Sequence, residues 1–428
     1  LLTCLTPAFR ITAVKSRAAS RFAVIADDLT GAMDTGVTFA RMGLDTVVSF
    51  GTGVSEGPAA VVVTTDSRAS NPGDAYDRVR SIIPGYSDFY LYKKIDSTLR
   101  GNVGRELQAI MEARHPQKVV VCPAFPENKR TVLGGSLLVD GTPVDQTYFA
   151  NDPLCPISEA HIPTLLGQQL GVAVGHIDLP AVEDEAHRLW QQIRDNTFDV
   201  LVLDATERRH LSAISRALAL AGEDWLPCGS AGLASELPAA FGHPRQGRPT
   251  TSLPTTTLPV LLVAGSRNEV TARQLQAAQD ILGIGLVSLD LQEFISRKGR
   301  KPRTHQLGNE VAKRLAAGET IALTSTFSAY VPSLSRLAAS IMASIAVHVL
   351  QKQALAGLVL TGGDVARALC ESLQVTGIRV LCELQPGIAV GELVGGTQQD
   401  LKVVTKAGGF GNDHALADAI RFLGGREQ

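Results

Sequence analysis

Residues 22–42 read FAVIADDLTGAMDTGVTFARM, and this segment alone indicates the fold class. Residues 22–26 form an apolar run typical of a buried strand, and residues 32–42 have the spacing of a helix. The polar, glycine-containing segment between them is typical of a turn. Strands that alternate with helices are characteristic of parallel α/β sheets, so the segment predicts an α/β domain.

The same alternation continues along the chain. Before residue 242, the sequence predicts strands at 46–50, 60–65, 89–92, 118–122, 172–177 and 200–204, and helices at 73–83, 103–114 and 182–194. After residue 259, it predicts strands at 260–264, 286–289, 321–324, 358–360, 380–383 and 401–404, and helices at 269–282, 333–355, 365–373 and 414–423.

The two series are separated by residues 242–259, GHPRQGRPTTSLPTTTLP, a stretch rich in Pro and Thr that is typical of a linker. A length of 428 residues also exceeds the roughly 250–300 residues of a single core. We therefore expect a two-domain α/β protein, in which each domain is a largely parallel sheet flanked by helices. Its expected parts are an N-terminal extension (1–20), a first domain (21–241), a linker (242–258) and a second domain (259–428).

The composition excludes several classes of protein. Hydrophobic residues make up 45% of the chain, which argues against global disorder, and a net charge of −2 gives no basic excess for nucleic acid. The six cysteines form no C-x-x-C pair and the nine histidines are scattered, so we expect reduced thiols in a cytoplasmic protein and no zinc site. No apolar run reaches membrane-spanning length. Residues 1–20 are basic and contain no acid, which leaves a transit segment or, as we prefer, a dispensable extension.

The first candidate site motif is the pair Asp27 and Asp28 at the end of the first strand. Ligands of α/β sheets bind beyond the carboxyl ends of the strands. Two acids at that position can bind substrate hydroxyls, hold a cation or act as a base, whereas the structural alternative is a helix cap formed by Asp28 or Thr30.

The second motif, KKIDSTLRGN at 93–102, also follows a strand. Its cations and hydroxyl groups suit an anionic, polyhydroxylated ligand, and the alternative is an exposed charged loop. A further cation follows the strand at 60–65 and would face the same edge. The substrate-binding candidates of this edge are Asp27, Asp28, Arg68, Lys93, Lys94, Asp96, Ser97 and Arg100.

Three glycine-containing turns from strand to helix occur in the second domain, at 264–268, 361–366 and 406–411. Backbone N–H groups at such turns can bind phosphates, although each turn alone could be structural. The chain has neither a P-loop nor a G-x-G-x-x-G fingerprint. The nucleotide-binding candidates of these turns are Ser266, Gly362, Gly363, Asp364, Gly408 and Gly409. A fourth run, PGIAVG at 386–391, has the pattern of a structural turn and a short strand.

Together these motifs resemble the four-carbon acid sugar kinase family. The matching runs, from about residue 21 to the C-terminus, are ADDLTGAMDTG (26–36), KKIDSTLRGN (93–102), GS-x-N-x-x-T-x-x-Q (265–274), TGGDVA (361–366), PGIAVG (386–391) and TKAGGFG (405–411). The second motif is similar to that of members acting on D-threonate. Members acting on D-erythronate share much of it, and those acting on 3-oxo-tetronate differ from it.

The resemblance implies a sugar-acid-binding first domain, an ATP-binding second domain and an active site in the cleft between them. The implied reaction moves the γ-phosphoryl group of ATP to the terminal hydroxyl of a tetronate, with Mg²⁺ on the phosphates. We expect Asp364 to be the base, with Asp28 as the rival, and Lys94 or Arg68 to bind the sugar carboxylate. No metal ligand is assigned.

Three matters stay open in the sequence. The protein could be a non-catalytic sensor of nucleotide and sugar acid, or a ligase or hydrolase that uses the same carboxylate. The stereochemistry of the tetronate is not fixed by the motifs. The oligomeric state is also open, with a homodimer as one alternative.

Overall fold

The computed structural model describes residues 21–51, 57–152, 154–243, 255–266, 268–294, 297–326 and 332–425. We call residues 21–243 the N-terminal half and residues 255–425 the C-terminal half. The predicted N-terminal extension and most of the predicted linker lie outside the described residues.

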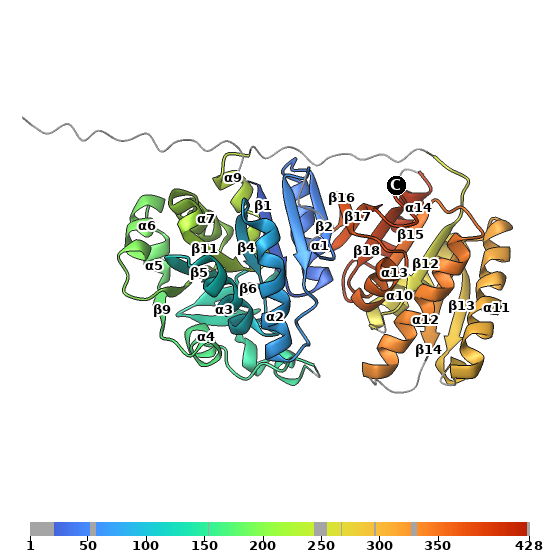
Figure 1. Cartoon of the computed structure of the whole chain (residues 1–428), viewed down its shortest axis with the longest axis horizontal. Helices are drawn as coiled ribbons and strands as arrows, with labels where there is room; N and C mark the ends of the chain where they lie inside the picture. Colours follow the sequence, from blue (N-terminus) through green and yellow to red (C-terminus); the bar gives the residue numbers. More distant parts are fainter. Residues whose placement is uncertain are drawn as a thin grey trace, which may run out of the picture.

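In the N-terminal half, strands and helices alternate along most of the chain (Figure 1). The elements are β1 (Phe22–Ala26), α1 (Leu29–Ala40), β2 (Thr46–Ser49), β3 (Ala60–Thr64), α2 (Pro72–Ile82), β4 (Tyr90–Lys94), α3 (Val103–Arg114), β5 (Lys118–Cys122), β6 (Arg130–Leu133), β7 (Ser136–Val139), β8 (Thr142–Pro143), α4 (Ile162–Leu170), β9 (Val174–Ile177), α5 (Leu179–Val182), α6 (Ala186–Arg194), β10 (Val200–Leu203), α7 (Arg208–Ala221), β11 (Trp225–Gly229), α8 (Ala231–Ala234) and α9 (Leu237–Ala240).

The C-terminal half repeats this alternation and adds a long β-hairpin. Its elements are β12 (Val260–Ala264), α10 (Glu269–Leu282), β13 (Gly285–Asp290), α11 (Arg297–Ala316), β14 (Ile321–Thr326), α12 (Pro332–Leu350), β15 (Gly357–Thr361), α13 (Gly363–Ser372), β16 (Gly377–Gln385), β17 (Ile388–Val394), β18 (Lys402–Lys406) and α14 (Ala415–Leu423).

One continuous sheet runs through both halves. Its strand order is β13-β14-β12-β15-β18-β17-β16-β2-β3-β1-β4-β11-β5-β10-β9. Most neighbours are parallel, which confirms the predicted α/β class, but β16 pairs antiparallel with both β17 and β2. The halves are therefore joined by backbone hydrogen bonds between β2 and β16, a joint that the expectation of one sheet in each domain did not include.

The hairpin β16–β17 turns at the PGIAVG motif. Gly387 has a φ of +76°, a conformation that favours glycine, and a Cβ built on it would overlap the ring of Phe410. The motif therefore closes a tight turn against the loop after β18. This geometry agrees with its interpretation as a structural turn followed by a strand.

Helix α1 lies at the joint between the halves. It contacts β2 and β3 of the N-terminal half and also β16 and β17 of the C-terminal half. It begins at Leu29, three residues before the predicted start, because the Asp28 side chain accepts a hydrogen bond from the backbone N–H of Gly31 and caps the helix. One apolar cluster likewise includes both Val48 of β2 and Ile378 of β16.

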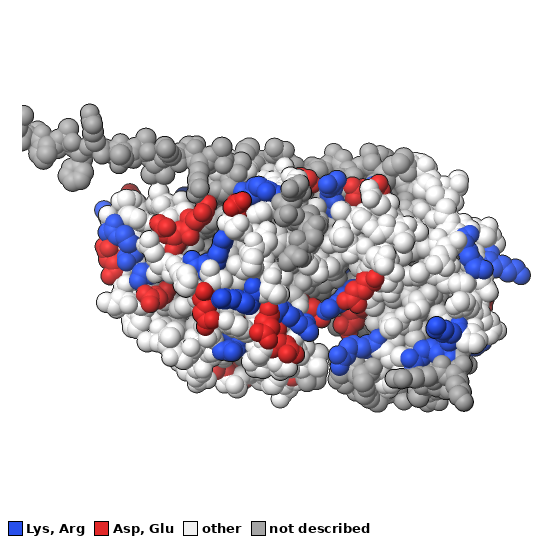
Figure 2. All heavy atoms as spheres, in the orientation of Figure 1, with Lys and Arg blue, Asp and Glu red and all other residues white. Residues whose placement is uncertain are grey.

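Three further properties concern surface charge, cysteines and the length of apolar helices. Basic and acidic side chains are interspersed over the N-terminal half on the face in view in Figure 2. The cysteines of the described residues form no disulfide with one another, and burial raises the pKa of Cys122, Cys228 and Cys370 to about 12. Within the described part of the chain, no helix combines the length and the apolar character needed to cross a membrane.

Candidate active site

Three neighbouring strands of the N-terminal half end at the same edge of the sheet. The register places Ala26 of β1 beside Thr64 of β3 and Lys94 of β4. The segments that follow these parallel strands therefore meet at this edge. The predicted site residues that come together there are Asp27, Asp28, Arg68, Lys94, Asp96, Ser97 and Arg100.

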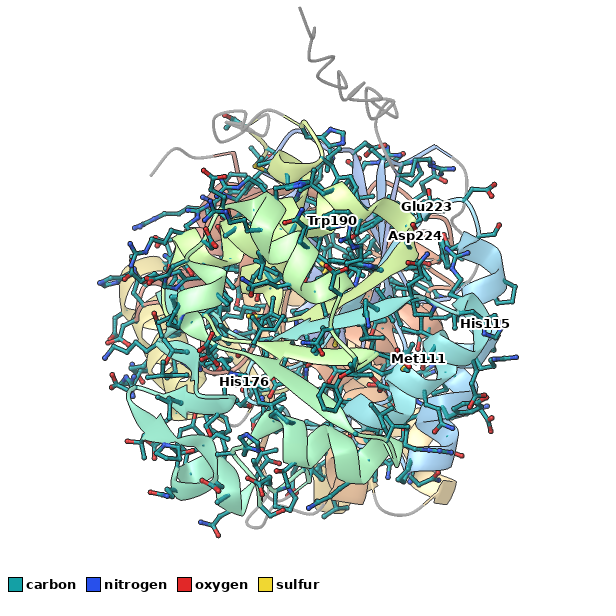
Figure 3. All side chains as sticks on the ribbon, turned by 90° about the vertical axis from the view of Figure 1, so that its left-hand side faces the viewer. Met111, His115, His176, Trp190, Glu223 and Asp224 are labelled. Carbon is teal, nitrogen blue, oxygen red and sulfur yellow. The ribbon has the colours of Figure 1, made fainter. Side chains whose placement is uncertain are left out.

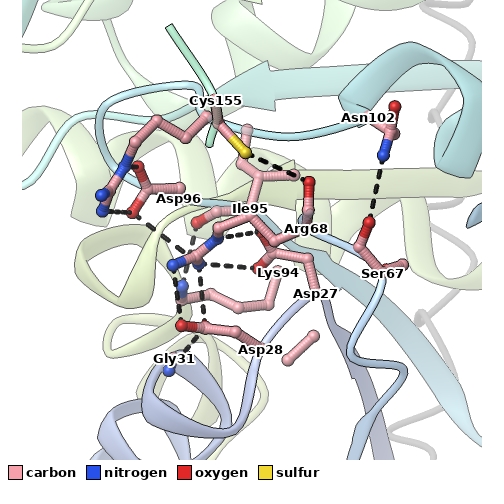
Figure 4. A network of polar contacts seen from close by, with 12 residues as sticks. Asp27, Asp28, Gly31, Ser67, Arg68, Lys94, Ile95, Asp96, Asn102 and Cys155 are labelled. Atoms are coloured by element: carbon pink, nitrogen blue, oxygen red, sulfur yellow. Dashed lines mark hydrogen bonds and ion pairs between the residues drawn. The ribbon is translucent and has the colours of Figure 1, made fainter. Parts of the chain in front are cut away.

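Arg68 holds both aspartates of the first motif (Figure 4). Its Nε donates to Asp27 Oδ2 over 2.7 Å and its Nη1 to Asp28 Oδ2 over 2.7 Å, while Nη2 donates to the other oxygen of each aspartate at 3.0 and 2.8 Å. The planar fork of this guanidinium is thus filled by two carboxylates. In this geometry Arg68 positions the aspartates, so of the two predicted partners of the sugar carboxylate it is the less available.

Burial and charge shift the two aspartates in different directions. Burial raises the pKa of Asp28, and although Arg68 opposes this rise, the charge of Asp27 supports it. Burial would also raise the pKa of Asp27, but Arg68 and the two lysines of β4 hold it below its usual range. Asp28 is therefore the member of the pair that takes up a proton more readily, and Asp27 remains ionised against Arg68.

The loop after β4 contains a second ion-paired arginine. Arg100 Nε donates to Asp96 Oδ2 over 2.7 Å, and its Nη1 donates to Asp152 Oδ2 over 3.1 Å. Thr98 also donates to Asp96. Burial would raise the pKa of Asp96, but Arg68 and Arg100 outweigh it and hold this pKa well below its usual range. Asp96 is thus a permanently charged acceptor at the wall of the site, suited to hydroxyl groups of a ligand.

The two lysines of the second motif point to opposite sides of β4, as successive residues of a strand do. Lys94 lines the site, and its Nζ donates to the carbonyl of Ile95 over 2.9 Å. Lys93 is fully buried on the other side, where its Nζ lies 2.7 Å from Glu106 Oε2 and also donates to two backbone carbonyls. The structure therefore does not bring Lys93 to the site, contrary to its predicted contact with substrate, because its ammonium is used within the core.

In the C-terminal half, β12, β15 and β18 are neighbours and their glycine turns meet. The N–H of Gly265 donates to Thr361 O over 2.9 Å, and that of Gly362 donates to Lys406 O over 3.1 Å. Gly362 has a φ of +101°, and a Cβ on it would lie 3.2 Å from the backbone nitrogen of Ser266. The three turns predicted to bind nucleotide thus form one backbone cradle, of the kind that binds phosphates.

The closest approach in this cradle is between Gly408 and Ser266. A Cβ built on Gly408 would overlap Ser266 Oγ, whereas a Cβ on Gly409 would have its nearest neighbour, Asn268 Nδ2, at 3.5 Å. Lys406 supports the same loop by donating to the carbonyls of Ala407 and Gly408 over 2.9 and 3.0 Å. Only glycine at position 408 therefore leaves Ser266 in place.

This difference gives a paired test of the cradle. We expect Gly408→Ala to raise the KM for ATP by about tenfold, since the added methyl displaces Ser266 and a misplacement of about 1 Å at such a site is costly. Gly409→Ala, whose added methyl has room, should change the KM for ATP by less than about twofold. Steady-state kinetics of both variants would measure this, and equal effects of the two changes would contradict the assigned cradle.

Two cavities lie beside these groups. The N-terminal cavity, of about 450 Å³, is lined by the acids and cations described above together with Phe410. The junction cavity, of about 490 Å³, is lined by the glycine turns at Gly265 and Gly362 and by parts of β14 and α12. Both cavities are lined by Asp28, Thr30 and Arg68, so these residues mark the place where they meet.

Asp364 lies in the first turn of α13 and lines the junction cavity. It is exposed, and within the described residues its carboxylate makes no hydrogen bond or ion pair. A Cβ built on the preceding residue, Gly363, would lie 3.8 Å from Thr30 Oγ1. The turn that carries Asp364 therefore lies next to the meeting point of the two cavities, opposite Asp28.

The sequence interpretation did not single out Asp34, and it considered Thr30 only as a possible helix cap. They stand four residues apart on α1, so they share one face of the helix, and this spacing was the signal available in the first motif. Both line the N-terminal cavity. Burial raises the pKa of Asp34 to about 6, against the opposing charge of Lys94 and with support from Glu383.

The raised pKa of Asp34 predicts a pH-dependent cost in stability. In the unfolded chain this carboxyl ionises near 3.8, but in the fold it keeps its proton to about pH 6. The folded state therefore binds more protons between these values, and stability falls as pH rises through this window, by up to about 3 kcal/mol. Asp34→Asn should remove this loss, so the stability of the variant relative to wild type should grow from pH 4 to pH 7.

Urea unfolding of both proteins across this pH range measures the difference. Asp77→Asn, at an exposed position on α2, is the control for general effects of pH. A stability difference between Asp34→Asn and wild type that stays constant with pH would contradict the raised pKa.

No group of three or more potential metal ligands occurs within the described ranges. A Mg²⁺ ion that binds together with ATP does not need three protein ligands, because phosphates, water and one or two carboxylates hold it. Apart from Asp364, the candidate base, Glu371 is the carboxylate of the C-terminal half that lines the junction cavity, and its Oε1 accepts from Arg367 Nε over 2.7 Å. The donor set is therefore compatible with a metal that binds together with the nucleotide.

In comparisons with known proteins, the two halves of the chain match two separate family models. A family model described as a sugar-binding N-terminal domain matches residues 22–237, and one described as a nucleotide-binding C-terminal domain matches residues 261–416. Solved structures of proteins from Salmonella typhimurium LT2 and Haemophilus influenzae share the fold, with TM-scores of 0.80 and 0.75 at 22% and 21% identity. They cover 94% and 93% of this chain and 98% of each of those chains.

Curated relatives match almost the whole chain. A D-threonate kinase of Salmonella typhimurium is 32% identical and a D-erythronate kinase of Heliobacterium modesticaldum is 31% identical, and both matches cover 94% of this chain and 97% of the relative. A D-threonate kinase of Bordetella bronchiseptica is 34% identical over 93% of this chain and 97% of its own. Fold and site thus define a protein with one half for a sugar and one for a nucleotide. The chain belongs to the four-carbon acid sugar kinase family.

Proposed function

We propose that this protein transfers the γ-phosphoryl group of ATP to the C4 hydroxyl of D-threonate. The observation that carries the proposal is the meeting of the two cavities at Thr30. There, a chamber lined by fixed acids and cations opens onto a glycine cradle suited to phosphates. Two relatives named D-threonate kinase, at 32% and 34% identity, support the choice of D-threonate.

In this proposal the N-terminal domain, residues 21–241, binds the sugar acid, and the C-terminal domain, residues 259–428, binds ATP. The remaining segments, 1–20 and 242–258, are an extension and a linker. Asp96, Ser97 and Lys94 face the sugar acid, while the turns at Ser266, Gly362–Gly363 and Gly408–Gly409 face the phosphates. Phosphoryl transfer depends mainly on positioning and on neutralising charge, and this arrangement supplies both.

Asp364 is the proposed base that takes the proton of the C4 hydroxyl. Asp28 is the weaker candidate because both of its oxygens already accept hydrogen bonds from Arg68, and one also accepts from Gly31. A carboxylate held in this way is suited to orienting a hydroxyl group. Asp364, which carries no such partners within the described residues, keeps its lone pairs for the substrate.

Bound Mg²⁺ would neutralise charge on the ATP phosphates, and closure of the two halves would keep water from the γ-phosphate. Mg²⁺ dependence, a cytoplasmic location and a homodimer remain predictions of this proposal. A non-catalytic sensor is the alternative from another class, but a sensor does not require acids on both sides of the meeting point.

The test is a coupled assay of ADP release with D-threonate, D-erythronate, L-threonate and 3-oxo-tetronates. D-threonate is expected to give the highest kcat/KM, and no ADP should form without a sugar acid. A preference for D-erythronate or a 3-oxo-tetronate would change the substrate and leave the reaction class in place. Binding of ATP and sugar acid without any turnover would support the sensor instead.

A further inference from the structure

A third arginine lines the N-terminal cavity and differs from the other two in its partners. Arg130 begins β6, and its Nη1 donates to the carbonyl of Asn128. Its Nε is buried and has no hydrogen-bond partner within the described residues, and no ion pair to Arg130 is found there. Arg68 and Arg100, in contrast, are each bonded to two aspartates. A buried donor without a partner is costly unless a ligand supplies the acceptor.

The hairpin that carries Arg130 is fixed to the main sheet. Val132 of β6 and Ala205 exchange backbone hydrogen bonds of 2.8 and 3.0 Å. At the turn, the buried carboxylate of Asp204 accepts from the N–H groups of residues 134 and 135 at 2.8 and 2.9 Å and lies 2.8 Å from His176 Nε2. His176 is labelled on β9 in Figure 3. The guanidinium is therefore held on a rigid element, which is what a binding group requires.

The position of Arg130 suits the end of the substrate that does not react. The C4 hydroxyl must lie near Asp28 and Thr30, where the cavities meet, and Arg130 lines the N-terminal cavity but not the junction cavity. The carboxylate of a four-carbon sugar acid is at the other end of its chain. Beside Arg130 stands the ring of Phe149, whose centroid lies 6.0 Å from Arg130 Cζ and 5.2 Å from Arg100 Cζ. This wall combines a cation with an apolar surface for the short carbon chain.

We propose that Arg130 is the residue that binds the carboxylate of the sugar acid. The inference rests on the proposed function and deepens it. It replaces the expectation that Arg68 or Lys94 binds the carboxylate, because the guanidinium of Arg68 already donates hydrogen bonds to Asp27 and Asp28. Lys94 lies next to Asp28 and Gly31, and thus nearer to the reacting hydroxyl. A guanidinium also matches a carboxylate with two parallel hydrogen bonds, which an ammonium cannot do.

The test compares D-threonate with D-threonamide, which keeps the hydroxyl groups and lacks the charge. In the wild type, kcat/KM for D-threonate should exceed kcat/KM for D-threonamide by about 100-fold. Arg130→Gln should lower kcat/KM for D-threonate by about 100-fold. The same variant should change kcat/KM for D-threonamide by less than about threefold. The KM for ATP should not change. Arg130→Lys should recover part of the loss, because it restores the charge without the fork.

Lys129→Gln is the matched control. It removes the neighbouring cation, which is exposed and pairs with Asp140 outside the cavity, and should leave both substrates unaffected. If the wild type phosphorylates D-threonate and Arg130→Gln keeps the preference over D-threonamide, Arg130 does not bind the carboxylate and the proposed function still stands. If the wild type phosphorylates no tetronate, the proposed function itself fails. Should Arg130→Gln not fold, Arg130→Met takes its place, because it keeps much of the side-chain length without the charge. An unchanged preference in Arg130→Met would equally overturn the inference.

Discussion

Replacing Asp364 by asparagine is expected to lower kcat by about 10²- to 10⁴-fold, the usual contribution of a general base. Asparagine keeps the size of the side chain in the first turn of α13 but cannot take the proton of the C4 hydroxyl. The KM values for ATP and D-threonate should change little, since the glycine cradle and the N-terminal cavity are not altered. Steady-state kinetics with both substrates varied would measure this.

Asp28→Asn is the comparison that separates the two candidate bases. Asparagine at position 28 weakens the ion pair with Arg68, so we expect mainly a raised KM for the sugar acid and some loss of stability. If Asp364→Asn keeps nearly wild-type turnover while Asp28→Asn loses it, the roles are reversed.

Replacing Lys93 by methionine is expected to lower the free energy of unfolding by about 3–5 kcal/mol. This is the effect of leaving one member of a buried ion pair without its partner. The pair is Lys93 and Glu106, whose side chains are 0% and 1% exposed. Glu106 also accepts a hydrogen bond from Ser67, which links α3 to the segment after β3. Urea denaturation would measure the loss.

Lys94→Met is the matched control on the neighbouring position of β4. Lys94 lines the N-terminal cavity, so its loss should act on the KM for sugar acid and on kcat, with a smaller change in stability. If Lys93→Met instead changes the kinetic constants and leaves the free energy of unfolding at the wild-type value, the structural role of Lys93 is contradicted. Its predicted contact with substrate would then be restored.

Much of the architecture could be predicted from the sequence because it depends on local patterns. The buried run of β1, the glycine turns and the polar loops at strand ends all follow from composition and spacing. Helix α11 was not predicted, and Pro302 within it breaks the usual helical pattern. The pairing of β2 with β16 joins residues more than three hundred positions apart, and no local pattern specifies such a contact.

The site was predicted at the level of residue clusters but not of individual roles. Period-2 alternation places Lys93 and Lys94 on opposite faces, yet only the packed structure shows which face borders the cavity. Arg68 and Arg130 likewise differ in their hydrogen-bond partners, and the local sequence around each arginine does not reveal this difference. Arg130 stands in a short hairpin that the strand pattern did not predict.

In the proposed reaction, a phosphoryl group moves from ATP to the C4 hydroxyl of a four-carbon sugar acid. The most direct measurement is a ³¹P and ¹H NMR spectrum of the product formed from ATP and D-threonate. We expect a phosphorus atom coupled to the C4 protons of the sugar acid, with an equal amount of ADP. A phosphate on the C1 carboxyl group, or free inorganic phosphate with unchanged D-threonate, would contradict it.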